Sequence, residues 1–116
     1  MDGTAFSVPV PPSLNMCFSN VPGRGRVKTA LYKAWIEEAG WAIASQRPSK
    51  IQGPYQAIIR LPEKTPGDID NRAKAVLDLM VKHKITPDDR LLHKLVVERT
   101  PGIASACVSI LPWEAA

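Results

Sequence analysis

The sequence predicts a small two-layer domain of the α/β (α+β) class, in which two main helices pack on a small mixed sheet. Three observations lead to this fold class. Segments that alternate apolar and polar residues, as strands do, are interspersed with segments whose apolar residues recur every three or four positions, as in helices. Prolines and glycines separate these segments. The chain has 116 residues without repeats or low-complexity tracts, so we expect one domain over residues 1–116.

The first half of the chain is expected to contain a strand, an extended loop and a helix. Residues 5–10 (AFSVPV) alternate apolar and small or polar side chains, and the prolines that follow end this strand in the loop PPSLN. From Thr29, a suitable N-cap, to about Ser45, apolar residues recur on one helical face with Trp35 as an aromatic anchor. Gly40 inside this helix costs about 1 kcal/mol relative to alanine, which indicates close packing against a neighbour.

The second half is expected to contain a strand, a helix and two further strands. Residues 55–61 (YQAIIRL) have the composition of a strand, and residues 71–82 have an apolar helical face, with Asp70 as the predicted N-cap. Residues 91–99 and 105–113 alternate like strands, and the connection TPGIA between them favours an antiparallel hairpin. The predicted order of elements is therefore β-α-β-α-β-β.

The two cysteines and the absence of long apolar runs indicate the compartment. Cys17 and Cys107 lie far apart in apolar surroundings and have no zinc-ligand spacing, so we expect free thiols in a reducing environment. No run of about 20 apolar residues would span a membrane, and the N-terminus lacks a basic segment followed by a long apolar one. We expect a soluble, cytoplasmic protein that makes no membrane contact.

The charge distribution points to an anionic partner. The formal net charge is +4 and the pI is about 9.3, which permits such a partner without proving one. Residues 20–33 (NVPGRGRVKTALYK) carry four cations and no acid, namely Arg24, Arg26, Lys28 and Lys33. Glycine lets a backbone approach a phosphate, and arginine binds its oxygens bidentately, so this segment suits a phosphate-binding arm. A solvated basic loop is the alternative.

Two pairs of aspartates bracket the second predicted helix. Asp68 and Asp70 come at its start, and Asp88 and Asp89 follow its end in the turn ITPDD. If the chain returns the second pair toward the first, carboxylates gather beside Lys74, and a hard divalent cation such as Mg²⁺ or Mn²⁺ suits that arrangement. Helix capping, ion pairs on a helix surface and a solvated turn explain the same residues without a metal.

Several of these motifs together resemble a known family. The segment DIDNRAKAVLDLM followed by ITPDD, together with PPSLN and a basic loop before the first helix, resembles the RusA family of Holliday junction resolvases of bacteria and their prophages. The resemblance extends from about Phe6 to Leu111. It implies a RusA-like fold and a homodimeric, structure-selective endodeoxyribonuclease. Such an enzyme nicks two opposing strands of a four-way DNA junction symmetrically in recombination and repair, in the cytoplasm of a bacterial or phage-infected cell.

The resemblance also implies roles for individual residues. Asp68, Asp70 and Asp89 match the metal-binding catalytic aspartates of the family, and Lys74 matches its catalytic lysine. Asp88 matches the first, less constant member of the acidic pair. Mg²⁺ is the expected cofactor and Mn²⁺ a substitute.

The expected DNA contacts lie around this group. Asn71 and Asn15 fall on the asparagines of the two motifs, where the resemblance implies supporting contacts to the substrate. The family often has arginines directly before its first aspartate, whereas this chain has EKTPG there. This departure shifts the expected phosphate contacts to four cations, Arg24, Arg26, Lys28 and Arg72.

The residue types also suit phosphodiester hydrolysis without the resemblance. Metal-bound carboxylates activate a water and neutralise charge in the transition state, and a lysine stabilises the developing charge. Two other classes remain open, a branched-DNA-binding module without catalysis and a metal-dependent hydrolase of small phosphate esters. For a homodimer, the expected interface is the apolar stripe of the first helix or an edge strand.

Overall fold

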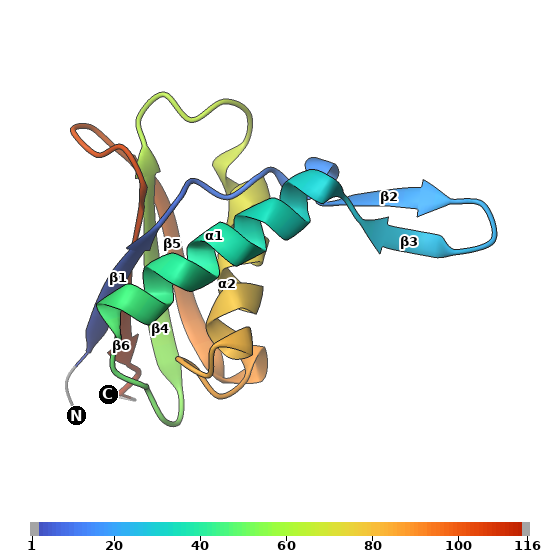
Figure 1. The fold of residues 1–116 in the computed structure, drawn as a ribbon. Helices are drawn as coiled ribbons and strands as arrows, with labels where there is room; N and C mark the ends of the chain where they lie inside the picture. The colour runs from blue at the N-terminus through green and yellow to red at the C-terminus, as the bar shows by residue number, and fades with distance from the viewer. Residues whose placement is uncertain (1–2, 115–116) are drawn as a thin grey trace.

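The structure is a computed structural model that describes residues 3–114, and it consists of a four-stranded sheet, two α-helices and a projecting hairpin (Figure 1). The strands of the main sheet are β1 (Thr4–Val8), β4 (Tyr55–Pro62), β5 (Leu92–Thr100) and β6 (Ala106–Pro112). The hairpin consists of β2 (Phe18–Val21) and β3 (Gly25–Lys28). The helices are α1 (Ala30–Gln46) and α2 (Ala73–Lys82), and three 3₁₀ turns are η1 (Leu14–Met16), η2 (Ile69–Arg72) and η3 (Asp89–Leu91). The predicted α/β class, with two main helices and a small mixed sheet, is confirmed.

The strand order in the main sheet is β1-β6-β4-β5, with β5 parallel to β4 and the other pairs antiparallel. The predicted antiparallel hairpin of the last two strands is therefore wrong, because β4 lies between them. The physical reason is the connection of residues 101–105 between β5 and β6. At about 3.3 Å per residue it spans more than the roughly 10 Å that separates strands on either side of a third strand. The most buried strand, β4, thereby gains a neighbour on each edge.

The core lies between one face of the sheet and the helices. Side chains of β4 alternate between buried and half-buried along all eight residues, which is the pattern of a sheet covered on one face only. Tyr55, Ala57, Ile59 and Leu61 are its buried members. They pack in one cluster with the buried faces of α1 and α2. The connection β4-α2-β5 joins two parallel strands, so it places η2 and η3 at the two ends of α2.

Helix α1 begins and packs as its sequence predicts. Thr29 is the N-cap, and its hydroxyl accepts a hydrogen bond from the backbone N–H of Tyr32 at 3.2 Å. Trp35 is buried and donates from Nε1 to the carbonyl of Pro9 at 2.8 Å. A side chain on Gly40 would meet the ring of His83 at 3.4 Å, which confirms the expected close neighbour.

The start of the second helix differs from the prediction. We expected Asp70 to cap a helix that begins near residue 71, but α2 begins at Ala73 and follows the 3₁₀ turn η2. Neither Asp68, the residue before η2, nor Arg72, the residue before α2, makes a capping hydrogen bond with its side chain. Because η2 supplies the first turn with backbone hydrogen bonds, Asp70 is not needed as a cap and its side chain is exposed.

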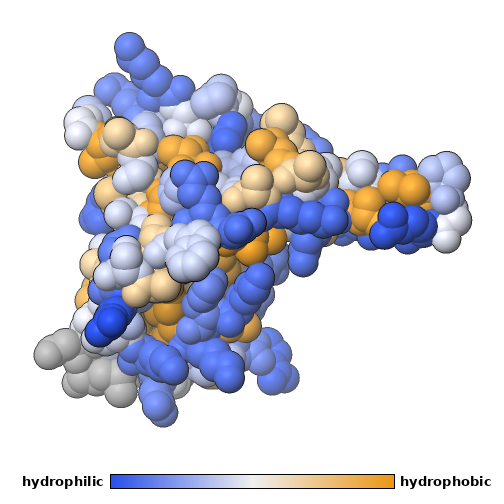
Figure 2. Space-filling view, in the orientation of Figure 1, coloured by the Kyte–Doolittle hydropathy of each residue, from blue (hydrophilic) through white to orange (hydrophobic). Residues whose placement is uncertain are grey.

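The hairpin β2–β3 was expected only as a basic loop. Its four residue pairs join Phe18–Val21 to Gly25–Lys28, and Gly23 at the turn has a φ of 78°. Short, polar strands around a proline-containing turn carry little apolar alternation, which explains why pattern reading missed them. Figures 1 and 2 show this hairpin standing out from the body of the molecule. We call residues 18–28 the arm.

The structure also bears on the expectations for the cysteines and for membrane-spanning segments. Cys17 and Cys107 are free, as predicted, and Cys17 is buried beside the base of the arm. Within residues 3–114, no helix is both long and apolar enough to cross a bilayer.

Candidate functional site

The two aspartate pairs lie in the 3₁₀ turns on either side of α2. Asp68 directly precedes the turn η2 and Asp70 lies in it, after β4 and its loop, and both are exposed. Asp88 directly precedes the turn η3 and Asp89 begins it, just before β5, and both are half-buried. The sequence predicts these positions correctly as ends of a strand-helix-strand unit.

Lys74 links α2 to the second aspartate pair. Its Nζ lies 3.2 Å from Oδ2 of Asp89 and 2.9 Å from Oδ1 of Asp78, one turn further along α2. The chain therefore does return ITPDD to the first half of α2, which residue spacing alone did not establish. The hydrogen bond to Asp78 is the largest of the effects that raise the pKa of Lys74 above its usual 10.5; burial opposes it, and the hydrogen bond to Asp89 raises the pKa further. The ammonium is thus protonated throughout the neutral range.

Asp88 is held by its own turn rather than by Lys74. It accepts a hydrogen bond from the backbone N–H of Arg90 at 2.9 Å and two from the Arg90 guanidinium at 3.1 and 3.2 Å. The backbone bond first, and then the side-chain bonds, lower the pKa of Asp88 below its usual 3.8. The carboxylate is therefore fixed and charged at neutral pH.

The first pair has no such partners. Within residues 3–114, neither Asp68 nor Asp70 forms an ion pair or accepts a side-chain hydrogen bond. Arg99, on β5, holds the loop just before them by donating to the carbonyls of Thr65 and Gly67 at 3.2 and 2.7 Å. The backbone before these carboxylates is thus anchored while their oxygens face solvent.

The donor chemistry suits a hard divalent cation, since four aspartate side chains offer only oxygen ligands. The positions of these side chains do not form a complete metal site. Among residues 3–114, no three Asp, Glu, His or Cys side chains are grouped closely enough to hold a metal ion. Asp89 is engaged by Lys74, so a cation at that carboxylate competes with the ammonium.

The arm carries the predicted phosphate-binding cations on an exposed ribbon. Arg24, Arg26 and Lys28 are all exposed. The Arg26 guanidinium lies 3.9 Å above the centre of the Phe18 ring, which orients it across the base of the arm. Asn15 on η1 lines a shallow hollow together with these two residues. The arm and η1 thus bring the cations and the N-terminal asparagine to one surface.

Arg72 has a structural contact that its sequence position does not reveal. Its guanidinium donates to the carbonyl of Pro11 at 2.7 Å and to that of Pro66 at 3.1 Å. These bonds tie the PPSLN loop to the loop before η2. Asn71, beside it, is half-buried at the surface. Contacts of Arg72 and Asn71 with DNA stay predictions.

Sequence reasoning did not single out Tyr55 or Arg99 near the site. Burial raises the pKa of the Tyr55 hydroxyl, Thr86 opposes this effect, and the negative charges of Asp89 and Asp88 raise the pKa further. Both residues look like ordinary strand positions in the sequence. Only their long-range contacts distinguish them.

The comparisons with known proteins agree with the geometry. The model of the family described as Endodeoxyribonuclease RusA matches residues 8–110, which is most of the chain and includes all the side chains discussed above. No curated protein matches the chain.

Proposed function

Because this chain belongs to the RusA family of endodeoxyribonucleases, we propose that it resolves Holliday junctions by symmetric paired nicks in DNA recombination and repair. The enzyme class follows from the family, as a hydrolase that acts on DNA. The observation that best supports the site is the bond from Lys74 to Asp89 at 3.2 Å, because it joins the turn ITPDD to the helix that follows DIDN. The rest of the proposal concerns what these side chains do.

We propose that Asp68, Asp70 and Asp89 hold a catalytic Mg²⁺, with Asp88 as a supporting ligand and Mn²⁺ as a substitute. A divalent ion bound there supplies an activated water and positive charge beside the scissile phosphate. The exposed carboxylates of Asp68 and Asp70 are free to turn toward a ligand. Asp88 stays charged beside the Arg90 guanidinium, with which a metal ion at that carboxylate competes.

Lys74 is proposed to stabilise the negative charge that develops on the phosphate during hydrolysis. Its ammonium stays protonated at neutral pH because Asp78 and Asp89 raise its pKa. Asp78 holds the Nζ at 2.9 Å from the side of α2, so the lysine has a fixed starting position. A preorganised cation of this kind typically contributes about 3–4 kcal/mol to transition-state stabilisation.

The arm is proposed to bind the phosphates of one DNA duplex of the junction through Arg24, Arg26 and Lys28. Each cation that neutralises a phosphate releases a counterion, so binding weakens as salt rises. Asn15 and Asn71 are proposed to contact the substrate at the edges of the site. Arg72, next to Asn71 in the chain, is proposed to contact a phosphate there. The projecting shape of the arm gives it reach away from the body (Figure 2).

We further propose a homodimer, because two symmetric nicks require two active sites related by a two-fold axis. The apolar stripe of α1 is mostly buried against its own sheet, as Trp35, Ala39 and Ile43 show. The edge strand β5, with Leu95 at 40% exposure, is the better candidate. Sedimentation at micromolar concentration is expected to give twice the 12.7 kDa of one chain, and a 12.7 kDa species alone contradicts the dimer.

The test of the catalytic assignment compares Asp70→Asn and Asp89→Asn with the wild type on a synthetic four-way junction. Glu63→Gln, which neutralises an exposed acid in the loop after β4, is the matched control. We expect both aspartate variants to lose cleavage in Mg²⁺ while they retain junction binding in EDTA, and the control to cleave normally. Junction binding without cleavage by the wild type in any metal would instead support a DNA-binding module. Turnover of a mononucleotide ester would support a small-phosphate hydrolase.

A further inference from the structure

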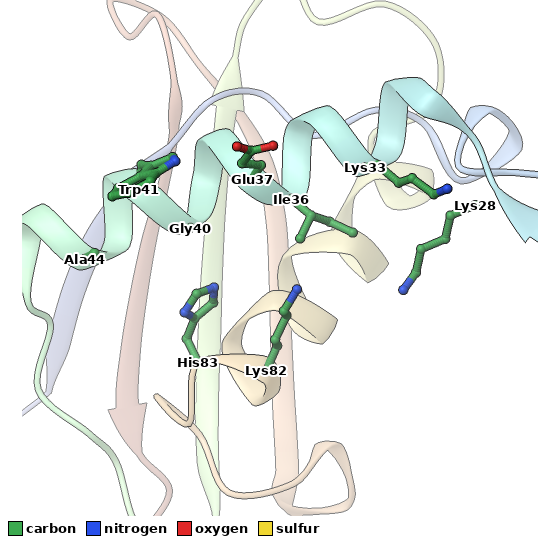
Figure 3. A pocket seen from close by; sticks show the side chains of 9 residues that line it. All are labelled: Lys28, Lys33, Ile36, Glu37, Gly40, Trp41, Ala44, Lys82 and His83. Carbon is green, nitrogen blue, oxygen red and sulfur yellow. The ribbon is translucent and has the colours of Figure 1, made fainter.

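A groove between α1 and α2 is left unused by the proposed reaction. It has a volume of about 650 Å³ and continues from the base of the arm along both helices. Figure 3 shows Lys28, from the end of β3, and Lys82, from α2, extending into it, with Trp41 further along α1. We call this the α1–α2 groove.

The groove carries an excess of positive charge. Lys28, Lys33 and Lys82 line it, and Glu37 is the acid on its wall. None of the three lysines forms an ion pair with another side chain in residues 3–114. Three ammonium groups along one groove repel one another, and an anion bound between them removes that repulsion. Regularly spaced phosphates suit such a row of cations.

The groove also has an apolar side, which suits the bases of a nucleic acid. Trp41 is 73% exposed, which is the largest exposure among the large hydrophobic residues of the described chain. Beside it, Ile36 and Gly40 form an apolar strip on α1. An exposed indole in a groove that cations line is an arrangement that proteins use to bind single-stranded nucleic acid, by stacking a base while lysines hold the phosphates.

The groove is continuous with the proposed active site. A second hollow, of about 300 Å³, shares Lys28, Ile36 and Lys82 with the groove and reaches Asp78. Asp78 in turn binds the Nζ of Lys74 at 2.9 Å. A strand that leaves the site near Lys74 therefore meets Lys28 and Lys82 before Trp41.

We propose that the α1–α2 groove binds one DNA strand of the junction on its way from the cleavage site. Lys28, Lys33 and Lys82 bind its phosphates, and Trp41 stacks on a base that is unpaired near the branch point. This proposal rests on the proposed function, since it takes junction DNA as the substrate; the groove shares Lys28 with the arm and adds Lys33, Lys82 and Trp41 to the DNA contacts.

The first test measures junction affinity in EDTA as a function of salt for Lys33→Gln/Lys82→Gln. The matched control is Lys50→Gln/Lys84→Gln, which removes two lysines from a separate hollow. Each lost phosphate contact lowers the slope of log K against log salt by about 0.7–0.9, and weakens binding about fivefold to eightfold at 0.1 M salt. We expect the groove variant to lose about 1.4–1.8 in slope and the control to match the wild type. Equal slopes in all three proteins overturn the proposal.

The second test concerns Trp41. We expect Trp41→Ala to bind a junction with unpaired bases at its centre at least fivefold more weakly than wild type, because base stacking on an aromatic ring is lost. Trp41→Phe is expected to restore most of the affinity. Normal affinity of Trp41→Ala overturns the stacking part. Failure of the proposed function is distinguishable, because then the wild type itself cleaves no junction in any metal, whereas failure of the groove alone leaves wild-type binding and cleavage intact.

Discussion

Replacing Lys74 with methionine separates its proposed catalytic role from its structural one. The substitution keeps much of the length of the aliphatic stem and removes only the ammonium. Two ion pairs are lost, with Asp78 at 2.9 Å and with Asp89 at 3.2 Å. All three side chains are 43–50% exposed, so water replaces much of the lost interaction.

The magnitudes follow from this exposure. Surface pairs contribute about 0.2–1 kcal/mol each, so we expect unfolding to become easier by about 1 kcal/mol. Cleavage is expected to fall by about 10²–10³, as for the loss of a preorganised charge-stabilising group. A metal ion bound near Lys74 would be repelled by its ammonium, by roughly 2 kcal/mol if the two charges were about 4 Å apart in water, so in Lys74→Met the metal affinity is expected to rise by up to about thirtyfold.

The assay combines three measurements on Lys74→Met, with Lys50→Met as the control for loss of a surface lysine. Thermal unfolding gives stability, calorimetry with Mn²⁺ gives metal affinity, and junction cleavage gives activity. Tighter metal binding together with lost cleavage supports a catalytic lysine beside a metal site. Unchanged metal affinity with cleavage within about threefold of wild type would refute the assignment of Lys74.

Three further predictions concern individual contacts. Arg72→Ala loses two hydrogen bonds to backbone carbonyls and is expected to destabilise the fold by about 2–3 kcal/mol in denaturant unfolding; unaltered stability with weaker DNA binding would make Arg72 a DNA contact instead. Asp88 is expected to titrate below 3.8 in a carbon NMR titration, so its contribution to stability is present above that pH and is lost as the pH falls through its lowered pKa. In Arg90→Ala that pKa is expected to move up only partly, because the backbone N–H remains. Gly40→Ala is expected to stabilise α1 by about 0.5–1 kcal/mol in the same unfolding assay, because the added methyl meets the ring of His83 only at 3.4 Å; a loss of stability would mean that His83 cannot yield.

Local patterns were sufficient for the elements that bury one face. The strand β4 and the helix α1 have clear periods, and Thr29 is a recognisable cap, so their positions followed from the sequence. The last two strands of the chain, β5 and β6, were recognised as strands. The strands that lie beside them in the sheet were not predicted, because an alternating pattern fixes which face of a strand is buried but not which strand pairs with it.

The candidate site was predictable in its residue types but not in its contacts. Lys74 and Asp78 stand four residues apart on α2, so their contact follows from helix geometry, whereas the bond from Lys74 to Asp89 depends on the path of the chain through η3. The contact of Arg72 with Pro11 joins residues 61 positions apart. Such pairs depend on the tertiary fold, which spacing along one element does not encode.

The most direct test of the central claim is strand mapping on a four-way junction labelled on each of its four strands in turn, with wild-type protein in Mg²⁺. We predict one nick at the same position in each of two opposing strands, and none in EDTA or with Asp70→Asn. Nicks that persist in Asp70→Asn would contradict the site at η2 and η3, because the hydrolysis would then not require these carboxylates.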